Sequence, residues 1–332
     1  MDLLRFALAG NYKRFYKDLK KIGKEKHRSP ILMFIDTALC TIVVGGGLQD
    51  YLNYRFYEKS WKERTKYVTI GYQAKFYQKV ANVKYAPFFS RKPNFLRNFK
   101  KYTKRDWYDP EMDYEKLEKF LDNHETFILK PIIGLGGADV QKLKSKSIKN
   151  RKDFYEKLKT EKMFLEEFII QDPTWGKISP NSVNTLRIMT SAVAGKSKIF
   201  FAAARIGNGS CVADNFHSGG MAVLIDLETG KLKGHAFNKK LDEFEKHPVT
   251  KIKIDGYQIP YWEEIKKMTL EAALVNEDVN VVGWDVAITK DGPVIIEGNR
   301  GPGWDLVQVL LNKGTKYMLE EVKKEMEANN LW

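Results

Sequence analysis

The feature that most constrains the fold is a hairpin pattern near the C-terminus. Two apolar stretches, Val281–Thr289 and residues 294–297, flank Lys-Asp-Gly at 290–292, which suits a short hairpin loop. A three-residue loop would pair Thr289 with Pro293, and this register can be continued along both strands. The pattern therefore predicts a two-stranded antiparallel ribbon whose paired positions are known.

Polar side chains fall on one face of this predicted ribbon. The register places Asp285 opposite Glu297 and Gly283 opposite Asn299, and opposite residues point to the same face. Two carboxylates this close repel each other unless a cation neutralises them, and oxygen ligands suit Mg²⁺ bound to nucleotide phosphates. The alternative is a solvated polar face. The neighbouring glycines favour the metal site, because they thin the backbone where a ligand must approach; they are Gly283, Gly298, Gly301 and Gly303.

Two further segments could contact a nucleotide. Residues 127–131 read as a strand ending in Lys130, and Gly134, Gly136 and Gly137 follow, whose backbone amides could cradle phosphate. This loop lacks the GK[ST] ending of a P-loop. Residues 166–169, Glu-Glu-Phe-Ile, end an apolar strand, and their backbone could bind an adenine edge.

The remaining pattern mixes helices with antiparallel hairpins. We expect hairpins at 183–206 and 223–237, helices at 148–160 and 261–275, and one closing helix at 305–328. This irregular alternation predicts an α+β or mixed α/β fold rather than a barrel.

Taken in order, these motifs resemble the ATP-grasp superfamily. The resemblance implies an α+β fold in which two lobes clamp ATP between antiparallel sheets, with ATP and Mg²⁺ as cofactors. It implies that nucleotide phosphates are bound by Lys92 and Lys130 and by a phosphate loop of Gly134, Gly136 and Gly137. It implies an adenine hinge of Glu166, Glu167, Phe168 and Ile169, followed by a ribose contact from Asp172 or Gln171. It also implies that Mg²⁺ is held by Asp285, Glu297 and Asn299.

The middle of the chain is similar to the glutamate-adding ligases of this superfamily. Arg187, Arg205, Asn215 and His217 occur in the order of the residues that surround the transferred phosphate in those enzymes. Guanidinium groups suit bidentate contact with phosphate or carboxylate, and surface ion pairing is the alternative. D-alanine–D-alanine ligases carry a basic residue where this chain has Gly283, so their amino-acid specificity is not transferred.

The N-terminal third looks like that of the sugar-transfer-associated ATP-grasp proteins, which accompany surface polysaccharide synthesis. The segments that carry this resemblance are Asp36, Asp50-Tyr51, residues 56–59, residues 92–99 and Arg105-Asp106-Trp107. We expect a basic helical region at 1–90, an N-lobe at 91–170 and a C-lobe at 171–332.

Charge is concentrated at the N-terminus. The chain has a net charge of +14, and residues 1–110 contain 24 basic and 9 acidic residues, a balance of +15. A basic helix at 3–26 could lie on anionic lipid or simply be solvated. Residues 30–48 predict a buried helix rather than a membrane span, because Asp36 interrupts the apolar run. No RNA-binding signature accompanies the basic residues, which disfavours nucleic acid as a partner.

The resemblance implies an ATP-dependent carboxylate–amine ligase that acts through an acyl phosphate. Its co-substrates would be a carboxylate and an amine, and an anionic glycan or sugar precursor fits the charge. The sugar could supply the carboxylate, or an amino sugar could supply the amine that an amino acid acylates. Kinase chemistry, ligation to a protein tail and a basic binding module are the alternatives. The two cysteines, Cys40 and Cys211, form no framework for disulfides, and no signal peptide is evident. We therefore expect a cytoplasmic protein with peripheral contact to the inner membrane face.

Overall fold

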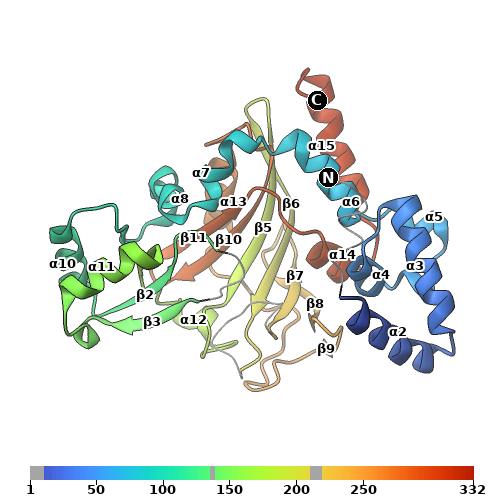
Figure 1. Ribbon diagram of the computed structural model, residues 1–332, viewed down its shortest axis with the longest axis horizontal. Coiled ribbons are helices and arrows are strands. Elements are labelled where there is room, and N and C mark those ends of the chain that lie inside the picture. Colours follow the sequence, from blue (N-terminus) through green and yellow to red (C-terminus); the bar gives the residue numbers. More distant parts are fainter. Residues whose placement is uncertain (1–10, 135–138, 210–218) are drawn as a thin grey trace. The chain divides into compact units, whose positions relative to one another are not determined.

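The chain divides into two compact units. The computed structural model describes residues 11–134, 139–209 and 219–332. One unit comprises residues 11–80 and 303–332, and its described part is helical. The other, Ala81–Pro302, contains two antiparallel sheets (Figure 1). This combination confirms the predicted α+β class.

The smaller sheet has four antiparallel strands in the order β1-β4-β2-β3. Their bounds are β1 (Trp107–Tyr108), β2 (Thr126–Pro131), β3 (Gln141–Lys144) and β4 (Met163–Glu167). Helices α10 (Tyr114–Asn123) and α11 (Arg151–Glu161) bury an apolar stripe against this sheet (Figure 1). In α10 the stripe is Leu117, Phe120 and Leu121, the three- and four-residue spacing of one helix face.

The larger sheet has seven antiparallel strands in the order β11-β10-β5-β6-β7-β8-β9. Their bounds are β5 (Thr185–Val193), β6 (Lys196–Ile206), β7 (Met221–Ile225), β8 (Leu232–Asn238), β9 (Glu243–Phe244), β10 (Val281–Thr289) and β11 (Gly292–Asn299). Helix α13 (Trp262–Ala273) contacts β5, β6, β10 and β11. Both predicted hairpins in the middle of the chain are present, and Ala194 and Gly195 turn the first one with positive φ angles.

The C-terminal hairpin differs from the prediction in its turn but not at the polar face. Thr289 pairs with Gly292, so the loop has two residues and the predicted three-residue loop is wrong. The register then shifts by one at a bulge next to Asp285. As a result Asp285 does lie opposite Glu297, and Gly283 opposite Asn299, as predicted.

Short helices line the back of this hairpin. They are η2 (Val83–Tyr85), α7 (Ala86–Ser90), α8 (Lys92–Asn98) and α9 (Lys100–Thr103), while α12 (Pro173–Gly176) follows β4. Phe89 of α7 and Phe99, between α8 and α9, contact Trp284 of β10, and Phe95 of α8 stacks on Phe99. A Cβ on Gly298 would lie 2.9 Å from Trp284 and 3.0 Å from Phe95. Close packing therefore explains Gly298, and the prediction that it makes room for a ligand is wrong.

The helical unit has an aromatic core. Its elements are α2 (Tyr12–Lys26), α3 (Pro30–Val44), α4 (Leu48–Asn53), η1 (Phe56–Glu58), α5 (Trp61–Arg64), α6 (Ile70–Val80), α14 (Asp305–Leu311) and α15 (Lys316–Ala328). The prediction of a single closing helix at 305–328 is wrong, because the helix is interrupted between α14 and α15. Gly314 lies there against the backbone of Lys66, where a Cβ would be 2.5 Å from the carbonyl group.

The apolar segment after residue 30 forms a helix with one buried face. Met33, Thr37 and Cys40 are buried, whereas the large apolar residues on the other side of α3 are exposed. The prediction that this helix is buried is therefore wrong for half of its surface. Among the described residues no single helix is long and apolar enough to cross a membrane. The pair of α2 and α3, bent by 118°, has the length and composition of a membrane span only when the two helices are taken together.

Asp50 gives the helical unit a predicted dependence on pH. Its carboxylate accepts hydrogen bonds from the backbone of Gly47 (2.8 Å) and Ile70 (2.9 Å), and burial raises its pKa from 3.8 to about 6. The folded state therefore binds a proton more tightly than the unfolded state, so the free energy of unfolding falls as pH rises from about 4 to about 6. Two pKa units correspond to about 3 kcal/mol.

Asp50→Asn is expected to remove this slope, because the amide cannot ionise. Denaturant unfolding between pH 4 and pH 7.5 measures it, with the exposed Asp291→Asn as the control. An unchanged slope in Asp50→Asn would show that another group is responsible.

Candidate active site

The three predicted metal ligands lie together on one face of the large sheet. Asp285 of β10 and Glu297 of β11 are directly paired, and the Asn299 amide donates to Glu297 Oε1 over 3.3 Å. Burial, followed by the nearby Asp285 carboxylate, raises the pKa of Glu297. This is the electrostatic conflict expected of two carboxylates at a site that a cation would relieve.

Two arginines from neighbouring strands reach the same carboxylate. Arg187 Nε lies 2.7 Å from Asp285 Oδ1, and an Arg205 nitrogen lies 3.0 Å from Asp285 Oδ2. Thr185 accepts hydrogen bonds from Arg205 at 2.9 and 2.8 Å, which orients that guanidinium. Although burial alone would raise the pKa of Asp285, the two guanidiniums hold it below its usual value.

These residues fit a divalent cation. Asp285 Oδ1 is buried and accepts no hydrogen bond from any described residue, because Arg187 approaches it outside hydrogen-bonding geometry. Asp285, Glu297 and Asn299 therefore offer oxygen atoms on one face, the donor chemistry that Mg²⁺ takes. The predicted strand pairing of Asp285 with Glu297 and of Gly283 with Asn299 is present, and the role of the three residues as metal ligands stays a prediction.

The two predicted phosphate lysines lie near this face. Lys92, the first residue of α8, donates to the carbonyl oxygens of Pro131 (3.3 Å) and Gly134 (3.0 Å), where the glycine loop begins. Burial, followed by the charge of Lys130, lowers the pKa of Lys92. Lys130 also acts electrostatically on Glu297. Gly136 and Gly137 lie outside the described residues.

The side chain of Glu166, in the predicted adenine hinge, pairs with two cationic side chains. Its buried carboxylate contacts both Lys130 and Arg105. Although burial alone would raise the pKa of Glu166, Arg105 and Lys130 hold it below its usual value. The Glu166 side chain therefore orients Lys130, and only the backbone of this residue remains a candidate for adenine contact.

Arg105 connects the two sheets, a role that the sequence did not predict. Besides Glu166 on β4, it donates to the carbonyl oxygens of Ile295 (2.6 Å) and Ile296 (2.8 Å) on β11. The Arg105 side chain is only 3% exposed. The motif Arg105-Asp106-Trp107 was a signal of family resemblance, but it contained no indication of this contact.

The rest of the hinge leaves an apolar surface. Glu167, Phe168 and Ile169 are half-buried, and Lys142 lies over the Phe168 ring at 3.8 Å. Asp172, a predicted ribose ligand, is buried and caps α12, with Oδ1 accepting from Thr174 and Trp175 at 2.8 Å. Gln171 is likewise bonded to the backbone of Ser182 and Asn184. Local structure thus accounts for both side chains without a ribose.

The two remaining predicted catalytic residues, Asn215 and His217, lie outside the described residues.

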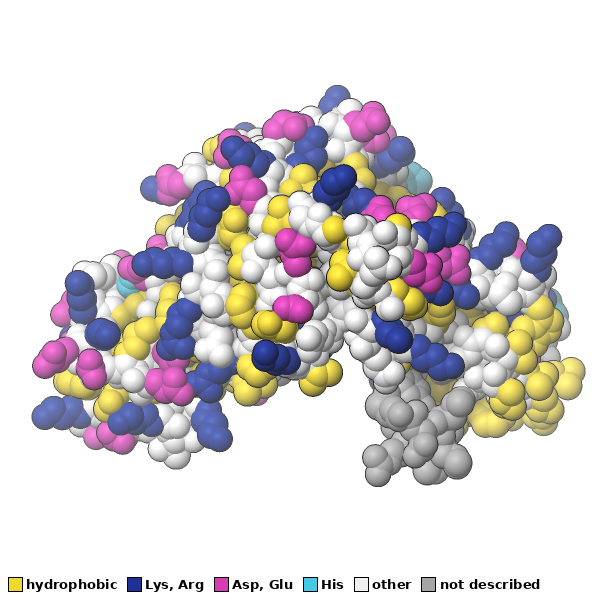
Figure 2. Space-filling view, turned by 90° about the horizontal axis from the view of Figure 1, so that it is seen from above, with side chains coloured by type: hydrophobic (Ala, Val, Ile, Leu, Met, Phe, Trp, Pro, Cys, Tyr) yellow, Lys and Arg dark blue, Asp and Glu magenta, His cyan; other side chains and the backbone are white. Residues whose placement is uncertain are grey.

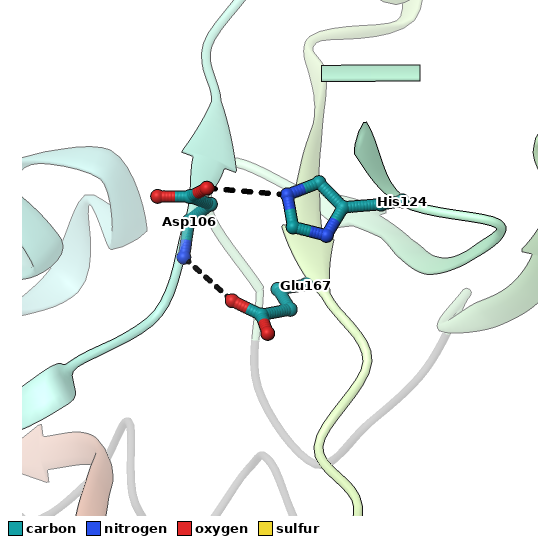
Figure 3. Close-up of side chains that lie close together, drawn as sticks. All are labelled: Asp106, His124 and Glu167. Carbon is teal, nitrogen blue, oxygen red and sulfur yellow. Dashed lines mark hydrogen bonds and ion pairs between the residues drawn. The ribbon is translucent and has the colours of Figure 1, made fainter. Parts of the chain in front are cut away.

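A separate polar cluster lies beside the small sheet (Figure 3). The ligand atoms of Asp106, His124 and Glu167 lie within 4.8 Å of one another. Asp106 contacts His124 at 3.2 Å, and its backbone amide donates to Glu167 at 3.0 Å. These internal contacts account for the cluster, and we assign no metal to it.

Comparison with known proteins identifies the family. A family model described as sugar-transfer associated ATP-grasp matches residues 94–324, more than half of the chain. The chain belongs to this family. The sequence-based resemblance is thereby confirmed, and the chain is an ATP-grasp protein.

Solved structures of other ATP-grasp enzymes are among the matches. The ligase PsnB with a minimal precursor is 15% identical, with a TM-score of 0.43 and coverage of 84% of this chain and 76% of PsnB. PsnB with a phosphomimetic precursor variant, Mg and ADP is 14% identical, with a TM-score of 0.45 and coverage of 74% and 61%. D-alanine–D-alanine ligase from Coxiella burnetii is 11% identical, with a TM-score of 0.39 and coverage of 76% and 64%. A search of curated proteins gives no match.

Proposed function

We propose that this sugar-transfer associated ATP-grasp enzyme joins the carboxylate of a sugar or uronic acid to an amine, such as an amino acid, in the synthesis of a capsular or other cell-surface polysaccharide. One observation carries the choice of a carboxylate substrate. Arg187 and Arg205 both contact a carboxylate, that of Asp285, which is itself one of the candidate metal ligands. A pair of fixed guanidiniums that binds one carboxylate is suited to bind a substrate carboxylate or an acyl phosphate.

The reaction follows from this arrangement. A carboxylate oxygen of the substrate attacks the γ-phosphorus of ATP, the bond to the β-phosphate breaks, and ADP leaves. The amine then attacks the carbonyl carbon of the acyl phosphate, inorganic phosphate leaves, and the amine loses a proton. Mg²⁺, held by Asp285, Glu297 and Asn299, would neutralise phosphate charge when bound.

The chain's own residues position the reactants. Lys92 and Lys130 would bind the nucleotide phosphates, and Lys130 is oriented for this by Glu166. Arg187 and Arg205 would bind the substrate carboxylate and stabilise the charge on the transferred phosphoryl group. Asn215 and His217 are proposed to complete this part of the site, with His217 accepting the proton of the amine.

The positive charge of the N-terminal part of the chain suits an anionic substrate. A balance of +15 over residues 1–110 would attract an anionic glycan or a lipid-linked precursor at the cytoplasmic membrane face. The same charge predicts that the apparent KM rises with ionic strength.

The test combines binding with chemical trapping. We expect Mg·ATP at about 100 times its Kd to raise the free energy of unfolding by about 2.7 kcal/mol. With a uronic acid present, hydroxylamine as the amine should give a hydroxamate and ADP in equal amounts. Arg187→Gln should abolish hydroxamate formation, whereas Lys146→Gln, an exposed residue of the small-sheet region, should not.

Other outcomes would redirect the assignment. A stable phosphorylated product without hydroxamate would mean kinase chemistry. Transfer of an amino acid to a protein rather than to a sugar would identify a protein-modifying ligase. No stabilisation by Mg·ATP would contradict the proposed site altogether and favour a basic binding module.

A further inference from the structure

We propose that the exposed face of α3 binds the surface of a membrane that contains anionic lipids. The proposal concerns the helical unit and does not depend on the proposed function. It also differs from the sequence-based expectation, which placed membrane contact on the helix at 3–26.

The exposed side of α3 is apolar along its whole length. Its large exposed side chains range from 37% to 76% exposed, and they are Ile31, Leu32, Phe34, Ile35, Leu39, Ile42 and Val43. Hydrophobic side chains gather accordingly on the right of Figure 2. Scattered surface leucines are ordinary, but a continuous apolar helix face marks an interaction site.

The one charged residue of α3 is turned away from this face. Asp36 forms an ion pair with the buried Arg64, with 2.7 Å between Arg64 Nη1 and Asp36 Oδ1, and accepts a hydrogen bond from Tyr51 at 2.9 Å. Its charge is thus compensated inside the unit. The helix can enter an apolar layer without exposing a carboxylate.

Basic residues lie on the helix that packs against α3. Tyr12, Phe15 and Tyr16 of α2 contact Phe34, so the two helices are neighbours. Helix α2 carries seven lysine or arginine residues and two acidic residues, and the exposed basic residues are Lys13, Arg14, Lys17, Lys20, Lys21, Lys24 and Lys26. An apolar face with aromatic and basic neighbours is the composition of a helix that lies in a membrane interface.

The charge of α2 and the length of α3 favour a lipid surface over the other possible partners of this face. A second copy on the same face would bring two strongly basic α2 helices together, which is unfavourable. A helix of 15 residues is about 22 Å long, short of the roughly 30 Å hydrocarbon layer. An anionic lipid surface satisfies both the apolar face and the positive charge.

Vesicle flotation with the full chain tests the proposal. We expect at least about tenfold tighter binding to vesicles with 30% phosphatidylglycerol than to pure phosphatidylcholine, and weaker binding at 0.5 M salt. Ile35→Ser with Ile42→Ser should weaken binding about tenfold or more, because both side chains are exposed and would insert. The matched control, Val83→Ser with Val249→Ser, also removes two exposed apolar side chains and should leave binding unchanged.

Charge substitutions separate the two contributions. Neutralising Lys13, Lys17 and Lys24 of α2 to glutamine should reduce binding on the order of fivefold per charge. The same change at Lys146, Lys149 and Lys152, exposed residues of the other unit, should have little effect.

Three results would overturn the proposal. The first is absence of vesicle binding. The second is vesicle binding that the Ile35/Ile42 double variant does not weaken. The third is a concentration-dependent dimer, seen by light scattering, that this variant abolishes, since it would assign the face to a second copy. None of these bears on Mg·ATP stabilisation, so the test is independent of the proposed function.

Discussion

Asp285→Asn is expected to destabilise the nucleotide-free protein, whereas Glu297→Gln is not, although both substitutions should abolish stabilisation by Mg·ATP. Asp285 compensates two partly buried guanidiniums, so its neutralisation leaves Arg187 and Arg205 without their carboxylate and should cost about 3 kcal/mol. Glu297 has a raised pKa because burial and Asp285 oppose its charge. Its neutralisation should therefore leave the free energy of unfolding unchanged or raise it by about 1 kcal/mol.

Denaturant unfolding with and without Mg·ATP measures both effects. Turnover should fall on the order of 100-fold in either variant, because a metal contribution of several kcal/mol is lost. Asp291→Asn, in the exposed turn of the same hairpin, is the control and should change neither quantity. Equal destabilisation by Asp285→Asn and Glu297→Gln would contradict the charge arrangement described for this face.

Arg105→Met is the substitution expected to have the largest effect on stability. It removes the contacts that join β4 to β11, leaving the buried Glu166 carboxylate with Lys130 alone and two carbonyl oxygens without their donor. Loss of one partner of a buried ion pair costs about 3–5 kcal/mol. We also expect lower activity, because Glu166 orients Lys130.

Guanidinium unfolding measures this cost against a matched variant. Arg151→Met removes an arginine whose partner, Asp122, is exposed, and it should cost less than about 1 kcal/mol. Arg105→Lys keeps the charge but not the forked geometry, so it should fall between the wild type and Arg105→Met. Similar values for Arg105→Met and Arg151→Met would mean that the bridge between the sheets contributes little.

Local patterns were sufficient to predict much of the second unit. Alternation and turn residues predicted the hairpin of β5 and β6, and the pairing of Asp285 with Glu297 was correct, because side chains alternate along a strand and a hairpin sets its own register. That pairing was reached through a wrong loop length, which a bulge at Asp285 compensates. A bulge depends on the packing of the whole sheet, so a hairpin pattern cannot reveal it.

Long-range contacts set the limits of prediction elsewhere. The break between α14 and α15 follows from the close approach of Gly314 to Lys66, far away in sequence. Likewise, Asp172 has the residue type of a ribose ligand, but local capping of α12 accounts for its side chain. The helical segment at α3 has the composition of a core helix, and only its neighbours determine that half of it is exposed.

The sequence by itself determined the α+β class and the pairing that puts Asp285, Glu297 and Asn299, the candidate metal ligands, on one hairpin face, because each depends on local periodicity. Only the tertiary structure decided that Arg187 and Arg205 converge on Asp285, that Arg105 joins two sheets through Glu166, and that α3 exposes an apolar face. These features depend on which side chains from distant segments meet. Burial and pairing of charge, which set their energies, are properties of that arrangement and not of any segment alone.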